Sequence, residues 1–358
     1  MRITPRSVTA RTAVMAAGLA LATGLAACSA ETTPASNSNP FSEGAVDPAA
    51  AAALPERYKS AGVINVASDI PYPPMEMFDE NQQLTGLDYD LAQALGAKLG
   101  VRLELQTQAF DSIIPSLQSG KNDIIMSGMN DTPERQETLD FVDYFHAGFS
   151  ILVPEGNPGN ITTVLDLCDK DVAVQKATVQ AEILRTYEQQ CLDKGSKPIR
   201  VSELPLETDV QTAVRSGKAA ADVVDSAVAA YAATTAGDGK IFDLVKDPAN
   251  PAGYNPVYTG IGVLKKDAEL SKALLAALQS LIADGTYDRI LAKYNLSDYT
   301  VKETGLNLGG TKPCPPPSQH PASLLPPEPR LPTAAARTTS LPFPSGTPGA
   351  GWEQRCSP

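Results

Sequence analysis

The sequence predicts an α/β protein built from two lobes of related design. Between about residues 58 and 303, apolar runs of strand length alternate with segments of helix length, which favours mostly parallel sheets with flanking helices. Ser-Gly-Lys turns at 119–121 and 216–218 each lead into an apolar run that ends in a polar residue, Ser127 and Asp225. These two residues are expected to face each other across a cleft, because the carboxyl ends of parallel strands line the ligand crevice. The alternative is that Ser-Gly-Lys is simply a frequent helix stop.

The first part of the body shows strand and helix patterns in order along the chain. A helix is expected at 88–99, because Leu91, Leu95 and Leu99 recur at helical spacing. Another helix is expected to begin at Thr132, a favoured N-cap residue, with proline in its first turn. The other expected elements are strands at 63–67, 103–105 and 124–126 and a short helix at 113–117.

The second part of the body continues the alternation. Short apolar runs predict strands at 151–153, 172–174, 199–201 and 223–224. Helical patterns lie between and after them, at 179–190, 210–214, 226–236, 268–283 and 287–294.

Composition and charge exclude several classes of function. The chain has 358 residues and a formal net charge of −12, which argues against nucleic acid as a partner because phosphate binding needs clustered Lys and Arg. Only two histidines are present, His146 and His320, which weakens the case for His-based catalysis and metal binding. The Gly-Lys pairs lack the remainder of a phosphate-binding loop. We therefore expect neither a cofactor nor a metal ion.

The N-terminus has the features of an export signal. Three arginines precede an apolar stretch at 13–27, which is too short for a confident membrane span. The stretch ends in Leu25-Ala26-Ala27-Cys28, which is similar to the lipobox of bacterial lipoproteins. This similarity implies a lipoprotein signal peptide at 1–27 and a lipidated, palmitate-bearing Cys28 on the outer face of the cell membrane. The alternative is a plain secretory signal followed by an accidental cysteine.

Both flanks of the body are expected to be unstructured. Residues 28–57 are rich in Ala, Ser, Asn, Thr and Pro without an apolar period, which is typical of a flexible tether. Of the 30 prolines, 13 lie between 313 and 358. We expect a disordered Pro-rich tail at 304–358, because such a segment lacks the apolar residues that offset ordering entropy. A frame-shifted C-terminus is the alternative.

Several segments together resemble one protein family, the amino-acid-binding proteins of ABC importers (bacterial solute-binding family 3). They follow the family's order along about residues 58–302 and lie at 68–76, 86–91, 110–117, 127–130, 132–136, 172–180 and 217–225. The resemblance implies the type II periplasmic-binding-protein fold, with a ligand cleft between lobes. Lobe 1 would comprise 58–147 and 258–303, and lobe 2 would comprise 148–257.

The resemblance also implies which residues hold the ligand. Arg135 matches the arginine that binds the α-carboxylate, for which a guanidinium fork is well suited. Asp225 matches the aspartate that holds the α-ammonium; its alternative role is the N-cap of the helix that follows. Thr178 would contribute at a helix start. The remaining matches are two walls, Tyr72 and Phe110, three residues around the amino-acid group, Ser127, Gly128 and Asn130, and an acidic residue at the side-chain end, Asp69.

Two cysteines flank the first strand–helix unit of lobe 2. Cys168 and Cys191 would close a loop of about 24 residues if they formed a disulfide, which an exported protein permits. The alternative is two buried free thiols. Zinc is not expected, because no second Cys/His pair lies nearby.

These features predict a lipid-anchored binding protein, monomeric and not an enzyme, that delivers a free amino acid to the membrane permease subunits of an ABC importer. A polar or cationic amino acid is favoured. One alternative is a periplasmic enzyme on the same fold, similar to cyclohexadienyl dehydratase. Another is the ligand-sensing subunit of a signalling system.

Overall fold

The computed structural model describes residues 39–310 except 43, 251 and 302. The predicted signal peptide, the lipidation site Cys28 and the tail beyond residue 310 lie outside this part of the chain. Within it, no helix combines the length and the apolar character needed to cross a bilayer.

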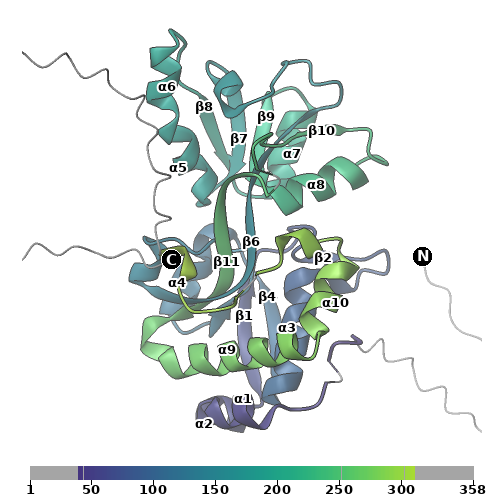
Figure 1. Cartoon of the computed structure of the whole chain (residues 1–358), viewed down its shortest axis with the longest axis vertical. Helices are drawn as coiled ribbons and strands as arrows, with labels where there is room; N and C mark the ends of the chain where they lie inside the picture. The colour runs from purple at the N-terminus through teal and green to yellow at the C-terminus, as the bar shows by residue number, and fades with distance from the viewer. Residues whose placement is uncertain (1–38, 43, 251, 302, 311–358) are drawn as a thin grey trace, which may run out of the picture. The chain divides into compact units, whose positions relative to one another are not determined.

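The described chain forms two α/β lobes that share one long mixed sheet (Figure 1). In lobe 1, β1 (Val63–Ser68) pairs in parallel with β4 (Arg102–Thr107) and β5 (Ile124–Ile125). In lobe 2, β7 (Asp171–Gln175) pairs in parallel with β8 (Arg200–Leu204) and β9 (Ala221–Asp225). The prediction of an α/β fold with two lobes is confirmed.

Two long antiparallel strands, β6 (Leu139–Pro154) and β11 (Tyr254–Leu264), run from one lobe into the other. At one end β11 pairs with β5, and at the other end β6 pairs with β9 and with β10 (Phe242–Val245). The register of β6 and β11 shifts between Tyr254 and Val257. The sequence predicted only the last part of β6, because nearly all residues of this strand are buried and show no alternation.

Helices cover the sheet in both lobes, and their apolar faces form the cores. In α9 the buried residues Leu270, Leu274, Leu278 and Leu281 follow one face of the helix. The helix expected at 179–190 is two helices, α5 and α6, which meet at Tyr187. The helices are α3 (Leu87–Leu99), α4 (Ile113–Gln118), α5 (Val179–Thr186), α6 (Glu188–Asp193), α7 (Glu207–Arg215), α8 (Ser226–Thr235), α9 (Ala268–Ala283) and α10 (Thr286–Lys293). Two short strands, β2 (Met77–Phe78) and β3 (Leu84–Thr85), form a separate small hairpin.

The predicted tether at 28–57 is too long. Two helices that the sequence did not predict, α1 (Pro48–Ala53) and α2 (Glu56–Ala61), lie in this region or overlap it. Asp47 caps α1 by accepting from two backbone N–H groups, and Leu54 and Ala50 are buried in the lobe 1 core. The run of alanines in α1 shows no alternation of apolar and polar residues, so the sequence gives no helix signal there. Its packing against the lobe 1 core shows that it is a helix.

The predicted tail likewise begins too early. Residues 304–309 lie along β6, where Leu306 forms a bridge with Val142. We call this segment the strap. Glycine and asparagine give it no strand pattern, and its backbone hydrogen bonds to β6 hold it in place.

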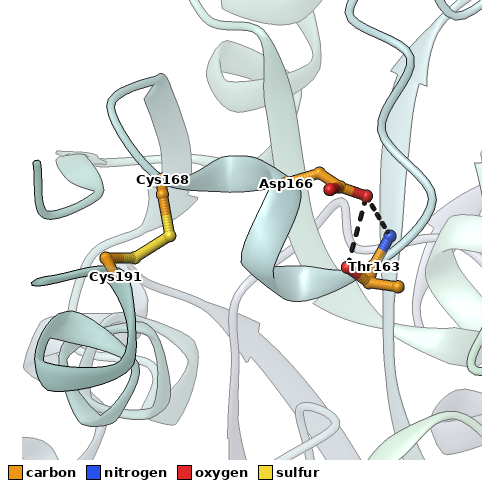
Figure 2. The surroundings of a disulfide bond; sticks show 4 residues. All are labelled: Thr163, Asp166, Cys168 and Cys191. Atoms are coloured by element: carbon orange, nitrogen blue, oxygen red, sulfur yellow. Dashed lines mark hydrogen bonds between the residues drawn. A yellow bond between two sulfur atoms is a disulfide. The ribbon is translucent and has the colours of Figure 1, made fainter. Parts of the chain in front are cut away.

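A disulfide bond joins Cys168 and Cys191, as Figure 2 shows. Cys168 follows the 3₁₀ helix Val164–Leu167, and Cys191 lies in α6. A capping box between Thr163 and Asp166 fixes the start of that 3₁₀ helix. Of the two alternatives, the structure has the disulfide and not the free thiols.

Candidate functional site

A small cavity of about 10 Å³, with a mostly polar wall, lies between the two lobes. This is about the space that one water molecule needs, so an amino acid fits only when the lobes move apart. The structure brings together eight of the predicted ligand residues with two glutamines to form its wall: Asp69, Tyr72, Phe110, Ser127, Gly128, Asn130, Gln175, Thr178, Gln180 and Asp225.

The carboxyl ends of the parallel strands supply much of this wall. Asp69 directly follows β1, and Ser127 comes two residues after β5. In lobe 2, Gln175 ends β7 and Asp225 ends β9. This is the edge of a parallel sheet at which ligands bind in open α/β folds.

Asp225 joins the two lobes across the cavity. Tyr72 of lobe 1 donates its hydroxyl hydrogen to Asp225 Oδ2 at 2.8 Å, and Asn130 Nδ2 lies 3.5 Å from Oδ1. Asp225 occupies the N-cap position of α8, but its side chain caps no backbone N–H group. The carboxyl group therefore serves the cavity and not the helix, and burial raises its pKa to about 6.

Arg135 lies beside the cavity without lining it. Its guanidinium donates to the carbonyl of Asn130 at 2.8 Å and, across the lobes, to the carbonyl of Ala177 at 3.1 Å. The same group lies 5.7 Å from the centre of the Phe110 ring. The helix expected to begin at Thr132 is only a 3₁₀ turn, Arg135–Glu137, although the Thr132 hydroxyl does accept from the Arg135 N–H at 3.3 Å.

Asp69 marks the acidic part of the wall. Gln175 of lobe 2 donates from Nε2 to Asp69 Oδ2 at 2.5 Å. Burial raises the pKa of Asp69 to about 6. A cationic group entering the cavity would favour the ionised form of this carboxyl group, because an opposite charge stabilises a buried carboxylate.

A pair of buried carboxyl groups supports the wall from behind. Ser127 accepts from the Asp69 N–H at 2.9 Å and donates to Glu76 Oε1 at 2.6 Å, so its hydroxyl hydrogen is used within the protein. Gly128 N donates to Asp88 Oδ2 at 2.8 Å. Burial raises the pKa of Glu76 and Asp88, and the charge of Asp88 adds to the effect on Glu76. Ser127 thus orients the wall and has little hydrogen-bonding capacity left for a ligand.

Gln175 and Gln180 line the cavity, although neither is among the ligand residues that the family resemblance implies. Both are buried, and Oε1 of Gln180 has no hydrogen-bond partner among the described residues. Gln180 lies in the first turn of α5, two residues after Thr178. Its position beside a predicted ligand residue at a helix start is the sequence signal that could have identified it.

An ion pair joins the two lobes beside the cavity wall. Lys176 Nζ of lobe 2 lies 2.8 Å from Asp111 Oδ2 of lobe 1. Both side chains remain partly exposed. In the described part of the chain, no group of three or more His, Cys, Asp or Glu side chains is arranged to hold a metal ion.

Two α/β lobes joined by two long strands, with a polar cavity between them, define a two-lobed solute-binding protein. Residues 64–297 match the sequence profile of the bacterial extracellular solute-binding proteins, family 3, and the chain belongs to this family.

The chain is similar to several named amino-acid-binding proteins. It is 32% identical over 262 residues to the arginine-binding protein ArgT of Corynebacterium glutamicum, covering 72% of this chain and 82% of that one. It is 29% identical to the histidine-binding periplasmic protein of Salmonella typhimurium, covering 69% of this chain and 90% of that one.

Solved structures with the same fold include binding proteins and an enzyme precursor. The holo form of ArgBP from T. maritima superposes with a TM-score of 0.57 at 31% identity, over 68% of this chain and 100% of that one. AncCDT-1 is described as an ancestral amino-acid-binding protein and a precursor of cyclohexadienyl dehydratase. It superposes with a TM-score of 0.59 at 34% identity, over 67% of this chain and 98% of that one.

Proposed function

We propose that this chain is an extracytoplasmic binding protein that captures a cationic amino acid between its lobes and delivers it to the permease subunits of an ABC importer. In this proposal lobe 1 comprises 58–147 and 258–303, and lobe 2 comprises 148–257. Cys28 carries the lipid anchor, and the protein acts as a monomer. Arginine is the first candidate ligand, because relatives from two bacteria are named as arginine-binding proteins.

The observation that carries this proposal is the convergence of complementary groups from both lobes on one cavity. Asp225 offers a half-buried carboxylate for an α-ammonium group, and Arg135 lies at the cavity edge for an α-carboxylate. Asp69 supplies a second buried carboxyl group at the side-chain end. The ligand contacts both lobes only when they are together, so its binding favours closure.

A dehydratase is the second candidate, favoured by the similarity to AncCDT-1. Such an enzyme needs a positioned acid or base and an additional cationic group for a second carboxylate. The cavity wall carries no His, Lys or Arg among the described residues that line it, and Arg135 lies beside it. This composition favours retention of an amino acid over conversion of a dicarboxylate.

Calorimetric titration with the common amino acids tests the function, together with incubation with prephenate. We expect tight binding of arginine or another cationic amino acid and no release of product from prephenate. Arg135→Ala and Asp225→Ala should each weaken binding by about 100-fold or more, since a charge-assisted hydrogen bond contributes about 1.5–3 kcal/mol and each group offers more than one. Arg200→Ala, which breaks an exposed pair within lobe 2, serves as the control. Unchanged affinity in Arg135→Ala and Asp225→Ala would refute the site assignment.

A further inference from the structure

The strap, residues 304–309, extends the sheet along an edge of β6. Gly305 accepts from the Asp143 N–H at 3.0 Å, and Asn307 N donates to the Phe141 carbonyl at 3.0 Å. On this edge, β9 pairs with β6 only from Phe149 onward. The strap therefore covers the part of this edge that lies in lobe 1.

The side chain of Asn307 and the backbone of the last strap residues reinforce this contact. Asn307 accepts from the Phe141 N–H at 2.8 Å and donates to Asp140 at 3.0 Å. Leu308 N donates to Asp143 Oδ2 at 2.9 Å, and Gly309 N donates to Asp131 Oδ2 at 2.8 Å. Both of these carboxyl groups are fully buried. Losing either N–H donor would leave a buried oxygen atom unpaired, which is costly.

Asp131 connects the strap to the candidate site. Its Oδ1 accepts from Gln136 Nε2 at 2.7 Å, and its own N–H donates to the carbonyl of Tyr258 in β11. It directly follows Asn130, whose carbonyl accepts from the guanidinium of Arg135 at 2.8 Å. One carboxyl group therefore holds both ends of the loop 130–136, which carries two of the predicted ligand residues.

Gly309 is the point at which this arrangement is most sensitive to a side chain. A Cβ atom at this position would lie 2.2 Å from the carbonyl oxygen of Asp131 and 2.9 Å from its Cγ. Backbone and side chain of Asp131 would both have to shift to accept even alanine. The close approach of strap and loop requires glycine.

We propose that the strap is a positioning element for the candidate site: through Gly309 and Asp131 it holds the loop 130–136, so that Asn130 and Arg135 are already placed for the carboxylate of an amino acid. Pre-organisation of this kind raises affinity because less ordering remains to be done on binding. This inference rests on the proposed function for its ligand but not for the contact between strap and loop.

The test uses the full chain with Gly309→Ala, with Asn307→Ala as a second variant in case the first does not fold. Gly44→Ala is the matched control, because a Cβ there meets only the Cβ of Ala97 at 3.5 Å. Binding of L-arginine is measured by calorimetry at a temperature where circular dichroism shows each variant to be folded. Hydrogen exchange of the loop 130–136 is compared with that of β7 and β9 in the same samples.

We expect Gly309→Ala to weaken L-arginine binding at least tenfold and to accelerate exchange in the loop while β7 and β9 keep their protection. Gly44→Ala should leave both the dissociation constant for L-arginine and the hydrogen exchange of the loop unchanged. An unaltered dissociation constant, or a uniform loss of protection in both lobes, would overturn the positioning role. If the unsubstituted protein binds no amino acid, the proposed function fails, whereas the exchange of the loop still reports whether the strap holds it.

Discussion

The ion pair between Lys176 and Asp111 gives a prediction about how closure sets affinity. The two side chains belong to opposite lobes and lie 2.8 Å apart, each next in sequence to a residue of the cavity wall and outside the predicted ligand contacts. The pair can form only when the lobes are together. It therefore stabilises the closed arrangement, and through it the bound ligand, without touching that ligand.

Exposure limits how large this effect can be. The side chains of Lys176 and Asp111 are 56% and 37% exposed. Exposed pairs of this kind contribute about 0.2–1 kcal/mol, which corresponds to about 1.4-fold to fivefold in a dissociation constant. We expect Lys176→Gln to weaken amino-acid binding by this amount at low ionic strength.

Calorimetry at about 20 mM and 500 mM salt is the assay. High salt should lower the affinity of the unsubstituted protein toward that of Lys176→Gln, because exposed charges are screened. Exchanging the two charges, with Lys176→Asp and Asp111→Lys combined, should restore part of the affinity. Arg185→Gln is the matched control, since Arg185 and Glu203 form a 2.7 Å pair of similar exposure within lobe 2. A loss above about tenfold, or an equal loss in the control, would refute the reasoning.

Two further predictions concern the disulfide and the pH dependence of binding. Replacing Cys168 and Cys191 by alanine should lower the free energy of unfolding by about 3 kcal/mol, because the disulfide closes a loop with a sequence separation of 23. An unchanged midpoint of urea unfolding would contradict this prediction. Because burial raises the pKa of Asp225 to about 6, the carboxyl group is ionised above that pH and loses its charge below it. Affinity for an amino acid, measured from pH 7 to pH 5, should therefore fall as the pH drops through 6. Asp225→Asn should bind weakly throughout and keep only the part of the fall that Asp69 causes, because burial raises the pKa of that carboxyl group to about 6 as well. A wild-type profile without a fall would show that the pKa of Asp225 is not raised.

Elements with a strong local pattern were predictable from the sequence. The helix expected at 268–283 matches α9 at both ends, and the strand expected at 63–67 falls one residue short of β1. Elements without a pattern were missed. In β11, Pro256, Gly260 and Gly262 interrupt the signal of a strand, and the pairing with β6 and β5 decides its conformation.

By itself, the sequence determined the α/β class and, through its resemblance to the family, indicated which residues to expect in the candidate site. The class follows from periodicities that are local in the chain. Where a residue's bonding partner lies far away in the sequence, only the tertiary structure decided between the alternative roles of that residue. Asp225 bonds to Tyr72, 153 residues away, and not to its own helix; Cys168 bonds to Cys191. Residues assigned to a disordered tail became the strap, because its backbone groups find partners on β6 and on Asp131 that no local pattern encodes.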